Sequence, residues 1–313
     1  MKEPRPKGPE VVAAYEQHVA RGYDELGAEG LSVRNWGTAI DRRGERFNAY
    51  TDPEYIDKVF GVPLREQIEG FGDESGQFMI ADFGGDDGFL LHQVMADVEQ
   101  ADTKKEIVGL VVDFDSTGKA KEKFLDRKAA GERKDMEYVV ADITRLPFAD
   151  ATLDAIISRM SIQYLDAEQQ VVFWEEVSRV LKENGLGIIL SLTGFYDHKQ
   201  FDDIIRSVVA IISGSQEWKR RMPAFNDFSN RTRFEERYSL APVCASRVVE
   251  FPMSVAAWAD RFELSERQLA SLNELYQTKK KEFPDLFETW DGELCLQSRL
   301  LEVRLRKKTH GRS

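Results

Sequence analysis

Short apolar runs alternate with amphipathic stretches from Phe78 onward, and this alternation is the strongest structural signal in the chain. The runs that predict buried strands are FMIADF (78–83), IVGLVVD (107–113), EYVVAD (137–142), LDAIIS (153–158) and LGIILSL (186–192). The stretches that predict helices are residues 89–99, 117–130 and 167–182, with Asn184-Gly185 marking the end of the last one. Strands joined in this way by helical crossovers predict an α/β fold with a doubly wound, mostly parallel sheet.

The chain outside this alternation has a different pattern, which divides it into four predicted segments. They are an N-terminal helical cap or lid (1–75), the cofactor-binding α/β core (76–194), a helical insertion that caps the substrate (195–242) and the C-terminal part of the core (243–313). The last segment predicts strands at 243–251 and 293–306, separated by a long amphipathic helical region at 254–282. These closing strands bring the expected sheet to seven strands.

Composition and charge narrow the functions that this fold can serve. Lys and Arg number 43 against 55 Asp and Glu, so the formal net charge is −12 and a broad basic surface for nucleic acid is disfavoured. The basic end RLRKKTHGR is interpreted as a solvated strand end and tail. No apolar run approaches the roughly 18 residues of a membrane span, and we find neither a secretory signal nor a disulfide framework. We expect a cytoplasmic protein without nucleic acid, membrane or metal partners, and the sequence leaves its oligomeric state open.

A glycine-rich turn follows the first predicted strand, where the chain passes from strand to helix. It reads Asp82-Phe83-Gly84-Gly85-Asp86-Asp87-Gly88, and its backbone leaves room for a nucleotide-type ligand. A tight turn without a ligand is the alternative interpretation, because glycine-rich first turns occur in doubly wound domains with many different functions.

Acidic residues end three successive predicted strands, at Asp82, Asp113 and Asp142. Ligands of open α/β sheets bind outside the carboxyl ends of the strands, so we expect these side chains to converge on one crevice. For an adenosine ligand, Asp113 would accept hydrogen bonds from both ribose hydroxyls, and Asp142 would accept one from the adenine amine. The amide of Ile143 would donate to a ring nitrogen, and Asp82 would lie near an ammonium group. Each aspartate taken alone also fits a helix cap or a turn.

The charge of the turn discriminates between the two adenosine cofactors that such folds hold. NAD would bring its pyrophosphate to the turn, where Asp86 and Asp87 would repel it as unpaired like charges. The dinucleotide pattern G-x-G-x-x-G also fails, because positions 86 and 89 are Asp and Phe. S-adenosylmethionine carries an ammonium and a sulfonium but no phosphate, so the same two carboxylates are neutral or helpful to its binding.

Four sequence blocks between about Phe78 and Leu192 carry a family resemblance: ADFGGDDG, GLVVDFD, VVADITRLPFADATLDAIIS and VLKENGLGIIL. They resemble the class I S-adenosylmethionine-dependent methyltransferases, in particular the small-molecule branch related to ubiquinone and menaquinone methyltransferases. The resemblance implies a Rossmann-like methyltransferase fold and S-adenosylmethionine as the cofactor. The cofactor-binding residues expected on this basis are Asp82, Phe83, Gly84, Gly85, Gly88, Asp113, Phe114, Asp142, Ile143 and Arg159.

Two positions depart from the family pattern. Asp86 stands where the family has its middle glycine, and Asp tolerates a positive φ better than most residues, at some cost in strain. Asn184-Gly185 stands where the family usually has two glycines, a mild change because Asn also adopts the left-handed conformation. The exit of the fourth strand, residues 158–161, lacks the Asn/Asp-Pro-Pro-aromatic block typical of DNA amino-methyltransferases, so DNA base methylation is disfavoured.

The predicted reaction is methyl transfer to a small organic acceptor by in-line displacement, in which the protein mainly positions the nucleophile and excludes water. A dedicated base is optional. Tyr164, His198 and Arg159 lie near the expected crevice and are interpreted as structural, so the catalytic residue is left unassigned. The alternatives are a non-catalytic scaffold or partner subunit of the same fold, to which Asp86 would point, and an NAD-dependent oxidoreductase.

Overall fold

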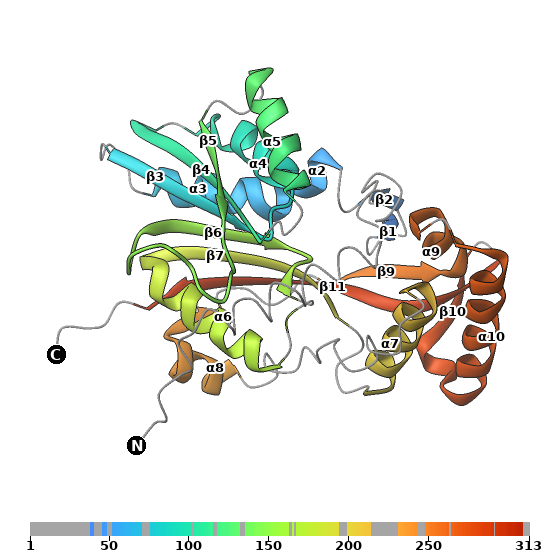
Figure 1. Ribbon diagram of the computed structural model, residues 1–313. Coiled ribbons are helices and arrows are strands. Elements are labelled where there is room, and N and C mark those ends of the chain that lie inside the picture. The colour runs from blue at the N-terminus through green and yellow to red at the C-terminus, as the bar shows by residue number, and fades with distance from the viewer. Residues whose placement is uncertain are drawn as a thin grey trace, which may run out of the picture.

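One mixed β-sheet runs through the described part of the chain, and helices cover both of its faces (Figure 1). The computed structural model describes residues 38–40, 46–48, 52–70, 76–101, 103–114, 118–131, 135–162, 165, 167–193, 199–213, 231–242, 248–262, 264–290 and 292–308. The strands are β1 (Thr38–Ile40), β2 (Arg46–Asn48), β3 (Gly76–Phe83), β4 (Lys105–Asp113), β5 (Met136–Val140), β6 (Leu153–Arg159), β7 (Leu181–Thr193), β8 (Leu240–Pro242), β9 (Val248–Ser254), β10 (Phe287–Trp290) and β11 (Glu293–Lys307). The helices are α2 (Pro53–Ile56), α3 (Val62–Glu69), α4 (Phe89–Val98), α5 (Lys119–Ala129), α6 (Ala167–Val180), α7 (Lys199–Ser213), α8 (Arg231–Tyr238), α9 (Val255–Phe262) and α10 (Glu266–Glu282), with a π-helical turn at Asp57–Gly61 and a 3-10 turn at Pro284–Leu286.

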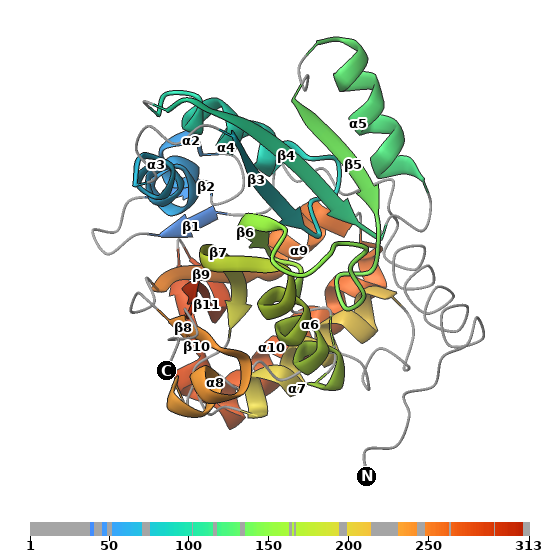
Figure 2. The same cartoon turned by 90° about the vertical axis from the view of Figure 1, so that its left-hand side faces the viewer.

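Seven strands form the centre of the sheet in the order β9-β11-β7-β6-β3-β4-β5, and Figure 2 shows β5 with α5 at one edge. β5, β4, β3, β6 and β7 run parallel, whereas β11 is antiparallel to both β7 and β9. The winding direction of the chain reverses between β3 and β6. Open α/β sheets bind their ligands outside the carboxyl ends of the strands at such a switch point, so the fold itself indicates where a site should lie.

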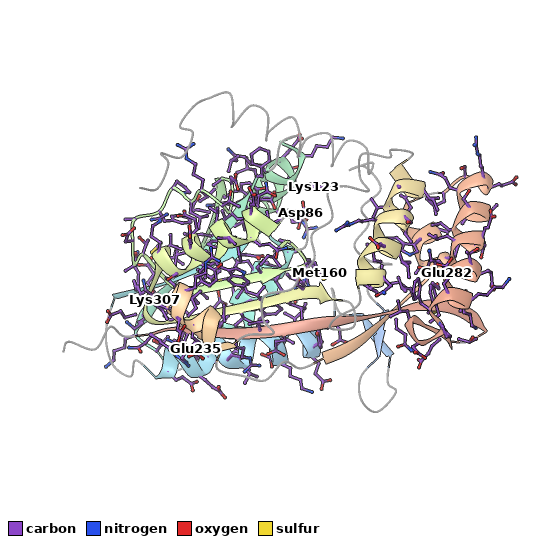
Figure 3. The ribbon with its side chains drawn as sticks, turned by 90° about the horizontal axis from the view of Figure 1, so that it is seen from below. Asp86, Lys123, Met160, Glu235, Glu282 and Lys307 are labelled. Carbon is purple, nitrogen blue, oxygen red and sulfur yellow. The ribbon has the colours of Figure 1, made fainter. Side chains whose placement is uncertain are left out.

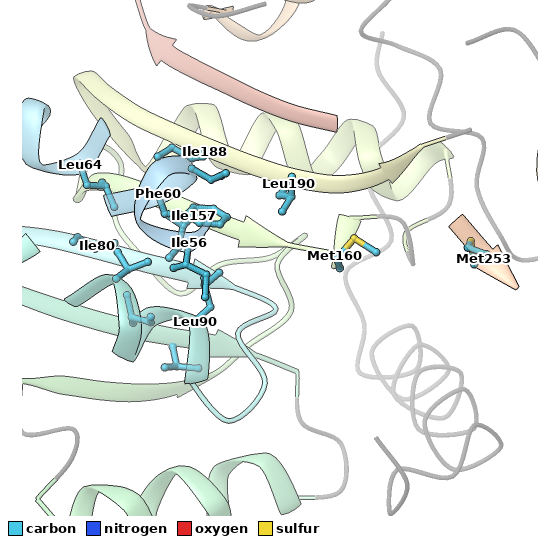
Figure 4. Packing of buried hydrophobic residues seen from close by; sticks show 14 of the residues in the cluster. Ile56, Phe60, Leu64, Ile80, Leu90, Ile157, Met160, Ile188, Leu190 and Met253 are labelled. Carbon is cyan, nitrogen blue, oxygen red and sulfur yellow. The ribbon is translucent and has the colours of Figure 1, made fainter. Parts of the chain in front are cut away.

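One face of the sheet packs against α2, α3 and α4, which lie on the same side of it in Figure 1. The period-2 alternation of strands puts Ile80, Ile157 and Ile188 on this face. They meet Phe60 and Leu64 of the N-terminal helices, and Figure 4 shows this group of side chains, all of which are fully buried. The helices that precede β3 are therefore part of the hydrophobic core of the sheet.

The opposite face packs against α6 and α8 through a second group of buried side chains. Phe83 of β3 contacts Phe173 of α6 edge to face, with ring centroids 6.3 Å apart. Leu305 of β11 belongs to the same group. Because alternate residues of a strand point to opposite faces, Glu302 and Arg304 lie on the face covered by α2 and α3.

The C-terminal lobe, made of α7, α9, α10, β10 and the first half of β11, lies beyond the carboxyl ends of the parallel strands (Figure 1). A buried tyrosine ties its parts together. The hydroxyl of Tyr276 accepts a hydrogen bond from Nε1 of Trp258 and donates one to the carbonyl of Met253, both at 2.9 Å. The Tyr276 ring also contacts Phe287, with centroids 5.4 Å apart. These contacts join α9, α10, β9 and β10 around one side chain.

The strands and helices predicted from the alternation of apolar and amphipathic stretches are confirmed, with changes at their ends. The helix predicted to reach residue 182 ends at Val180, because Leu181 already pairs with Leu153 of β6. The helical region predicted over 254–282 is confirmed, and it consists of two separate helices, α9 and α10. Ser265 begins α10 with a capping box to Gln268, a strong local start signal inside the amphipathic region.

The elements that the sequence did not predict are short strands at the margins of the sheet. β1, β2, β8 and β10 contain three or four residues each, too few for a recognisable periodicity. The strand predicted at 243–251 corresponds to β9 at Val248–Ser254, and residues 243–247 lie outside the described ranges. The division into four segments stays a prediction. Across the described ranges, no helix has both the length and the apolar character needed to cross a membrane.

Replacing Tyr276 with Phe should lower the free energy of unfolding by about 1–3 kcal/mol, because it removes two hydrogen bonds from a buried position while keeping the ring. Urea unfolding measures this change. Gln277→Ala, an exposed substitution next to it in α10, should leave stability within about 0.5 kcal/mol of wild type. Equal stability of Tyr276→Phe and wild type would contradict a role of this hydroxyl in holding the lobe together.

Candidate functional site

The glycine turn between β3 and α4 is held to β4 by hydrogen bonds to its backbone. The amide of Gly84 donates to the carbonyl of Val112 at 2.8 Å. The amide of Asp86 donates to Oδ2 of Asp113 at 2.9 Å. The turn and the end of β4 therefore form one ridge of fixed geometry at the switch point of the sheet.

The glycines of the turn are required by backbone conformation and by lack of space. Gly84 and Gly88 have φ of 74° and 77°, in the left-handed region that favours glycine. A Cβ on Gly84 would overlap the side chain of Ser161, and a Cβ on Gly85 would lie 2.9 Å from Oδ2 of Asp82. The amide of Gly88 closes the turn on the carbonyl of Gly85 at 2.8 Å. A larger residue at any of these positions would move the turn.

The two carboxylates within the turn have different surroundings. Asp86 is exposed and has a φ of 48°, so it adopts the positive φ that Asp tolerates. Oδ1 of Asp87 accepts the amide of Phe89 at 3.1 Å, and Oδ2 of Asp87 pairs with Nη2 of Arg127 at 3.3 Å. The expectation that Asp87 is an unpaired charge is therefore wrong. The sequence pattern gives no signal for this pair, because Arg127 comes from α5 and reaches the turn only in the folded protein.

Asp82 is buried under the turn, only 1% exposed, and neither of its carboxylate oxygens accepts a hydrogen bond. Burial raises the pKa of this carboxyl to about 7; the charge of Arg159 and the nearby main-chain amide of Leu91 oppose the shift, and Asp113 and Asp86 add to it. A buried polar group without hydrogen bonds costs free energy unless a ligand supplies the missing donors. The surroundings of Asp82 therefore suit a cationic partner.

The ends of β4 and β5 are joined beside the turn. The carbonyl of Asp113 accepts the amide of Ala141 at 2.9 Å, which brings Asp142 to the same edge of the sheet. Oδ1 of Asp142 accepts the amide of Thr144 at 2.8 Å and its hydroxyl at 2.7 Å. Asp142 thus closes a local turn, as the alternative interpretation of such aspartates expects, and its contact with adenine stays a prediction.

Two serine hydroxyls join the exit of β6 to the glycine turn. Oγ of Ser158 donates to the carbonyl of Phe83 at 2.8 Å, and Oγ of Ser161 donates to the carbonyl of Gly84 at 3.2 Å. Between the two serines, Met160 has a φ of 59°, which is a strained conformation for a large side chain. Such strain gathers at functional sites, and Figure 3 shows Met160 on the side of the core that faces the C-terminal lobe. The serines were missed as site residues, because their role depends on the turn in the neighbouring strand.

The other predicted residues fall into three groups. Arg159 ends β6 and acts on Asp82 by its charge, and Phe114 directly follows β4. The side chains of Phe83 and Ile143 pack with the core on the α6 face, so contact with a ligand in the crevice would involve their main chains. Outside the described residues lie Tyr164 and His198. The structure thus brings the glycine turn, Asp82, Asp113 and Arg159 together, and the individual roles of the predicted cofactor-binding residues stay predictions.

Comparisons with known proteins agree with this arrangement. Residues 88–189, which are 102 of the 313 residues, match a family described as a methyltransferase domain. The YcgJ protein from Bacillus subtilis is 14% identical, with a TM-score of 0.57 over 80% of this chain and 99% of that chain. Geranyl diphosphate C-methyltransferase from Streptomyces coelicolor A3(2) is 16% identical, with a TM-score of 0.52 over 96% of this chain and 100% of that chain. The [4+2]-cyclase SpnF is 14% identical, with a TM-score of 0.53 over 94% and 96%.

This is the class I methyltransferase fold. The expected Rossmann-like sheet is therefore confirmed. The sheet is mixed because β11, which lies between β7 and β9, is antiparallel to both of them. At these identities the likeness of a methyltransferase fold does not decide the reaction, as the description of SpnF as a cyclase illustrates. No curated protein sequence matches the chain. Among the residues that the structure describes, no three His, Cys, Asp or Glu side chains are grouped to hold a metal ion.

Replacing Asp82 with Asn should change the dependence of stability on pH. Because the pKa of Asp82 is raised from 3.8 to about 7, the folded protein keeps a proton that the unfolded chain releases, and stability falls as pH rises through this interval. Asp82→Asn cannot ionise, so it should gain on the order of 2–4 kcal/mol relative to wild type between about pH 5 and about pH 8. Urea unfolding at the two pH values measures the gain.

The control for this experiment is Asp126→Asn, an exposed carboxylate of α5. Its stability relative to wild type should not depend on pH over the same interval. If Asp82→Asn and wild type lost stability in parallel as pH rises, the carboxyl of Asp82 would not titrate in the folded protein as its burial requires.

Replacing Gly84 with Ala should destabilise the protein through two separate effects. The left-handed backbone costs about 1–2 kcal/mol for a residue with a Cβ, and the contact with Ser161 adds to this. In the double variant Gly84→Ala/Ser161→Gly, the steric part should be relieved and the backbone part should remain. Thermal unfolding of both single variants and the double variant measures the coupling, and strictly additive losses would show that the two side chains do not meet.

Proposed function

We propose that the protein is an S-adenosylmethionine-dependent methyltransferase that acts on a small organic acceptor. The observation that carries this proposal is the carboxylate of Asp82, buried beside the glycine turn without a hydrogen bond to either oxygen. An ammonium group next to it would supply the missing donors and lower its pKa. The match of residues 88–189 to a methyltransferase domain and the fold support the same reaction.

The residues at the carboxyl edge of the sheet fit the parts of such a donor. Gly84 and Gly85 expose main chain beside Asp82, where the methionine portion would bind. Asp113 would receive the ribose hydroxyls at the end of β4, and the turn formed by Asp142 and Ile143 would receive the adenine. When bound, S-adenosylmethionine supplies a methyl group already activated by the sulfonium.

The charges of the site favour this donor over a dinucleotide. Arg127 compensates Asp87, so the repulsion of a pyrophosphate is smaller than a count of acids in the turn indicates. Asp86 remains exposed in the turn, and Asp82 lies under it close to Asp113. A pyrophosphate on the turn would be repelled by these carboxylates, whereas a cationic donor is attracted by them.

The chain's own residues would act mainly by positioning. The hydroxyls of Ser158 and Ser161 fix the exit of β6 against the glycine turn, so the donor and the acceptor sides of the crevice keep a constant geometry. We assign no general base. The acceptor is proposed to be a small organic molecule, the class handled by the methyltransferases that the sequence blocks resemble. A net charge of −12 argues against nucleic acid as the acceptor.

Titration calorimetry with S-adenosylhomocysteine, which keeps the ammonium group of the donor, should show binding to the wild-type protein. Asp113→Asn should weaken this binding at least about tenfold, because an amide cannot accept two hydroxyl donors in the manner of a carboxylate. Asp126→Asn should bind as wild type does. NAD should give no heat and no thermal stabilisation.

Two results would overturn the proposal in different ways. Stabilisation by NAD in the absence of S-adenosylhomocysteine binding would indicate the oxidoreductase. A protein that binds neither ligand, although it is folded, would indicate a scaffold that has kept the fold without its cofactor.

A further inference from the structure

Two buried carboxylates in the described part of the chain have a fully buried oxygen without a hydrogen bond, namely those of Asp82 and Glu302. The other buried carboxylates there are engaged. Asp113 accepts a main-chain amide at 2.9 Å, and Asp154 accepts an amide at 2.9 Å and Nζ of Lys182 at 2.7 Å. A polar group left unsatisfied inside a folded protein requires an explanation. The proposed donor provides one for Asp82 and none for Glu302.

Strand register places Glu302 on the same face of the sheet as Asp82. Glu302 of β11 lies opposite Leu190 of β7, and Leu190 lies beside Arg159, the last residue of β6. Paired residues of neighbouring strands point to the same face, so these three side chains form a row at the level where β6 ends. Asp82 pairs with Ile157, two positions before Arg159, and therefore shares this face. With two strand spacings between them, the Cα atoms of Glu302 and Arg159 are roughly 10 Å apart.

The row lies beside a buried apolar cluster at the exit of β6. Figure 4 shows Leu190 close to Met160, which leaves the sheet after Arg159, with Met253 of β9 across from them. Leu190, Met160 and Met253 belong to one buried apolar cluster. Glu302 is directly opposite Leu190, so a carboxylate borders this apolar group on the side away from the glycine turn.

The ion pair of Glu302 accounts for only one of its oxygens. Oε1 of Glu302 accepts Nε of Arg304 at 2.6 Å, and Nη2 of Arg304 donates to the carbonyl of Lys58 at 3.5 Å. Oε2 of Glu302 is buried without a partner. Arg179 and Glu176 of the same protein form a bidentate ion pair instead. Nε and Nη2 of Arg179 donate to the two oxygens of Glu176, at 2.9 and 2.8 Å. Arg304 therefore fixes the position of Glu302 but leaves its second carboxylate oxygen without a hydrogen-bond donor.

We propose that Oε2 of Glu302 binds a donor group of the methyl acceptor, and that this group is an ammonium. The proposal rests on the function proposed above and names the class of its substrate, an amine. Asp82 would bind the ammonium of the methyl donor beyond the Arg159 end of the row, and Glu302, at the opposite end, would bind that of the acceptor. Glu302 is in this sense a binding residue for the acceptor, and it makes no contact with the methyl group.

The same arrangement discriminates against anionic acceptors. A phosphate or carboxylate placed next to Oε2 of Glu302 would face a like charge in a poorly solvated position. A hydrogen bond from a charged donor to a buried carboxylate contributes about 1.5–3 kcal/mol, which corresponds to a preference of roughly 10- to 150-fold. An alcohol of the same shape, which donates without a charge, should bind with intermediate strength.

The test uses three probes with one carbon skeleton: benzylamine, benzyl alcohol and benzoate. Their affinities are measured by titration calorimetry on the full chain, with and without saturating S-adenosylhomocysteine. We expect the wild-type protein to prefer benzylamine over benzoate at least about tenfold. Glu302→Gln keeps an oxygen for Arg304 but removes the charge, so it should lose this preference while S-adenosylhomocysteine binds within about twofold of wild type. Glu293→Gln, an exposed residue of the same strand, is the matched control and should behave as wild type.

Each contrary outcome has a distinct meaning. Equal or absent binding of the three probes to the wild-type protein overturns the proposal, as does an unchanged preference in Glu302→Gln. If Glu302→Gln loses stability and S-adenosylhomocysteine binding together, and Glu302→Asp does the same although it keeps the charge, Glu302 is structural and the proposal is overturned. A Glu302-dependent preference for benzylamine in a protein that does not bind S-adenosylhomocysteine would overturn the methyltransferase function alone.

Discussion

Hydrogen bonds between successive strand exits hold the carboxyl edge of the sheet as one unit. Ala141 is bound to Asp113 between β5 and β4, the glycine turn to Val112 between β3 and β4, and Ser158 to Phe83 between β6 and β3. At least one partner in each of these bonds is a main-chain group, so the geometry does not depend on long, flexible side chains. A scaffold of this kind can keep a carboxylate such as Asp82 buried without partners, because the surrounding structure fixes its position.

The sequence predicts the parallel part of this fold well, for a physical reason. Strands buried on both faces are continuous apolar runs, and such runs as residues 107–113 and 186–192 are easy to distinguish from amphipathic helices. The two-helix structure of 254–282 was not predicted, since α9 and α10 both present an apolar side to the same lobe and the break between them depends on one capping serine. Very short strands such as β1 and β8 form only because a longer strand offers them an edge.

The sequence predicted the site residues whose position depends on the local sequence. It missed the residues that reach the site only through contacts between distant elements. The glycine turn follows from backbone requirements, and Asp82 and Asp113 follow from their place at strand ends. Ser161 and Arg127 belong to the site only because their elements pack beside the turn, which a single sequence does not reveal. The surroundings of charged side chains were likewise not predictable from the sequence. Within six residues, the carboxylate of Asp82 is buried, that of Asp86 is exposed and that of Asp87 is paired with an arginine.

β11 belongs to the core and to the C-terminal lobe at once. Its residues 299–306 pair with β7, and its residues 293–296 pair with β10. Because a strand alternates sides at every residue, deleting or inserting a single residue in the middle of β11 would turn one of these halves over relative to the other. Glu302 would then exchange faces with Val303, or the lobe would lose the pairing that positions it. Insertions and deletions of the kind that surface loops tolerate would therefore disrupt this strand. Sequence variation in β11 is expected to occur by substitution alone.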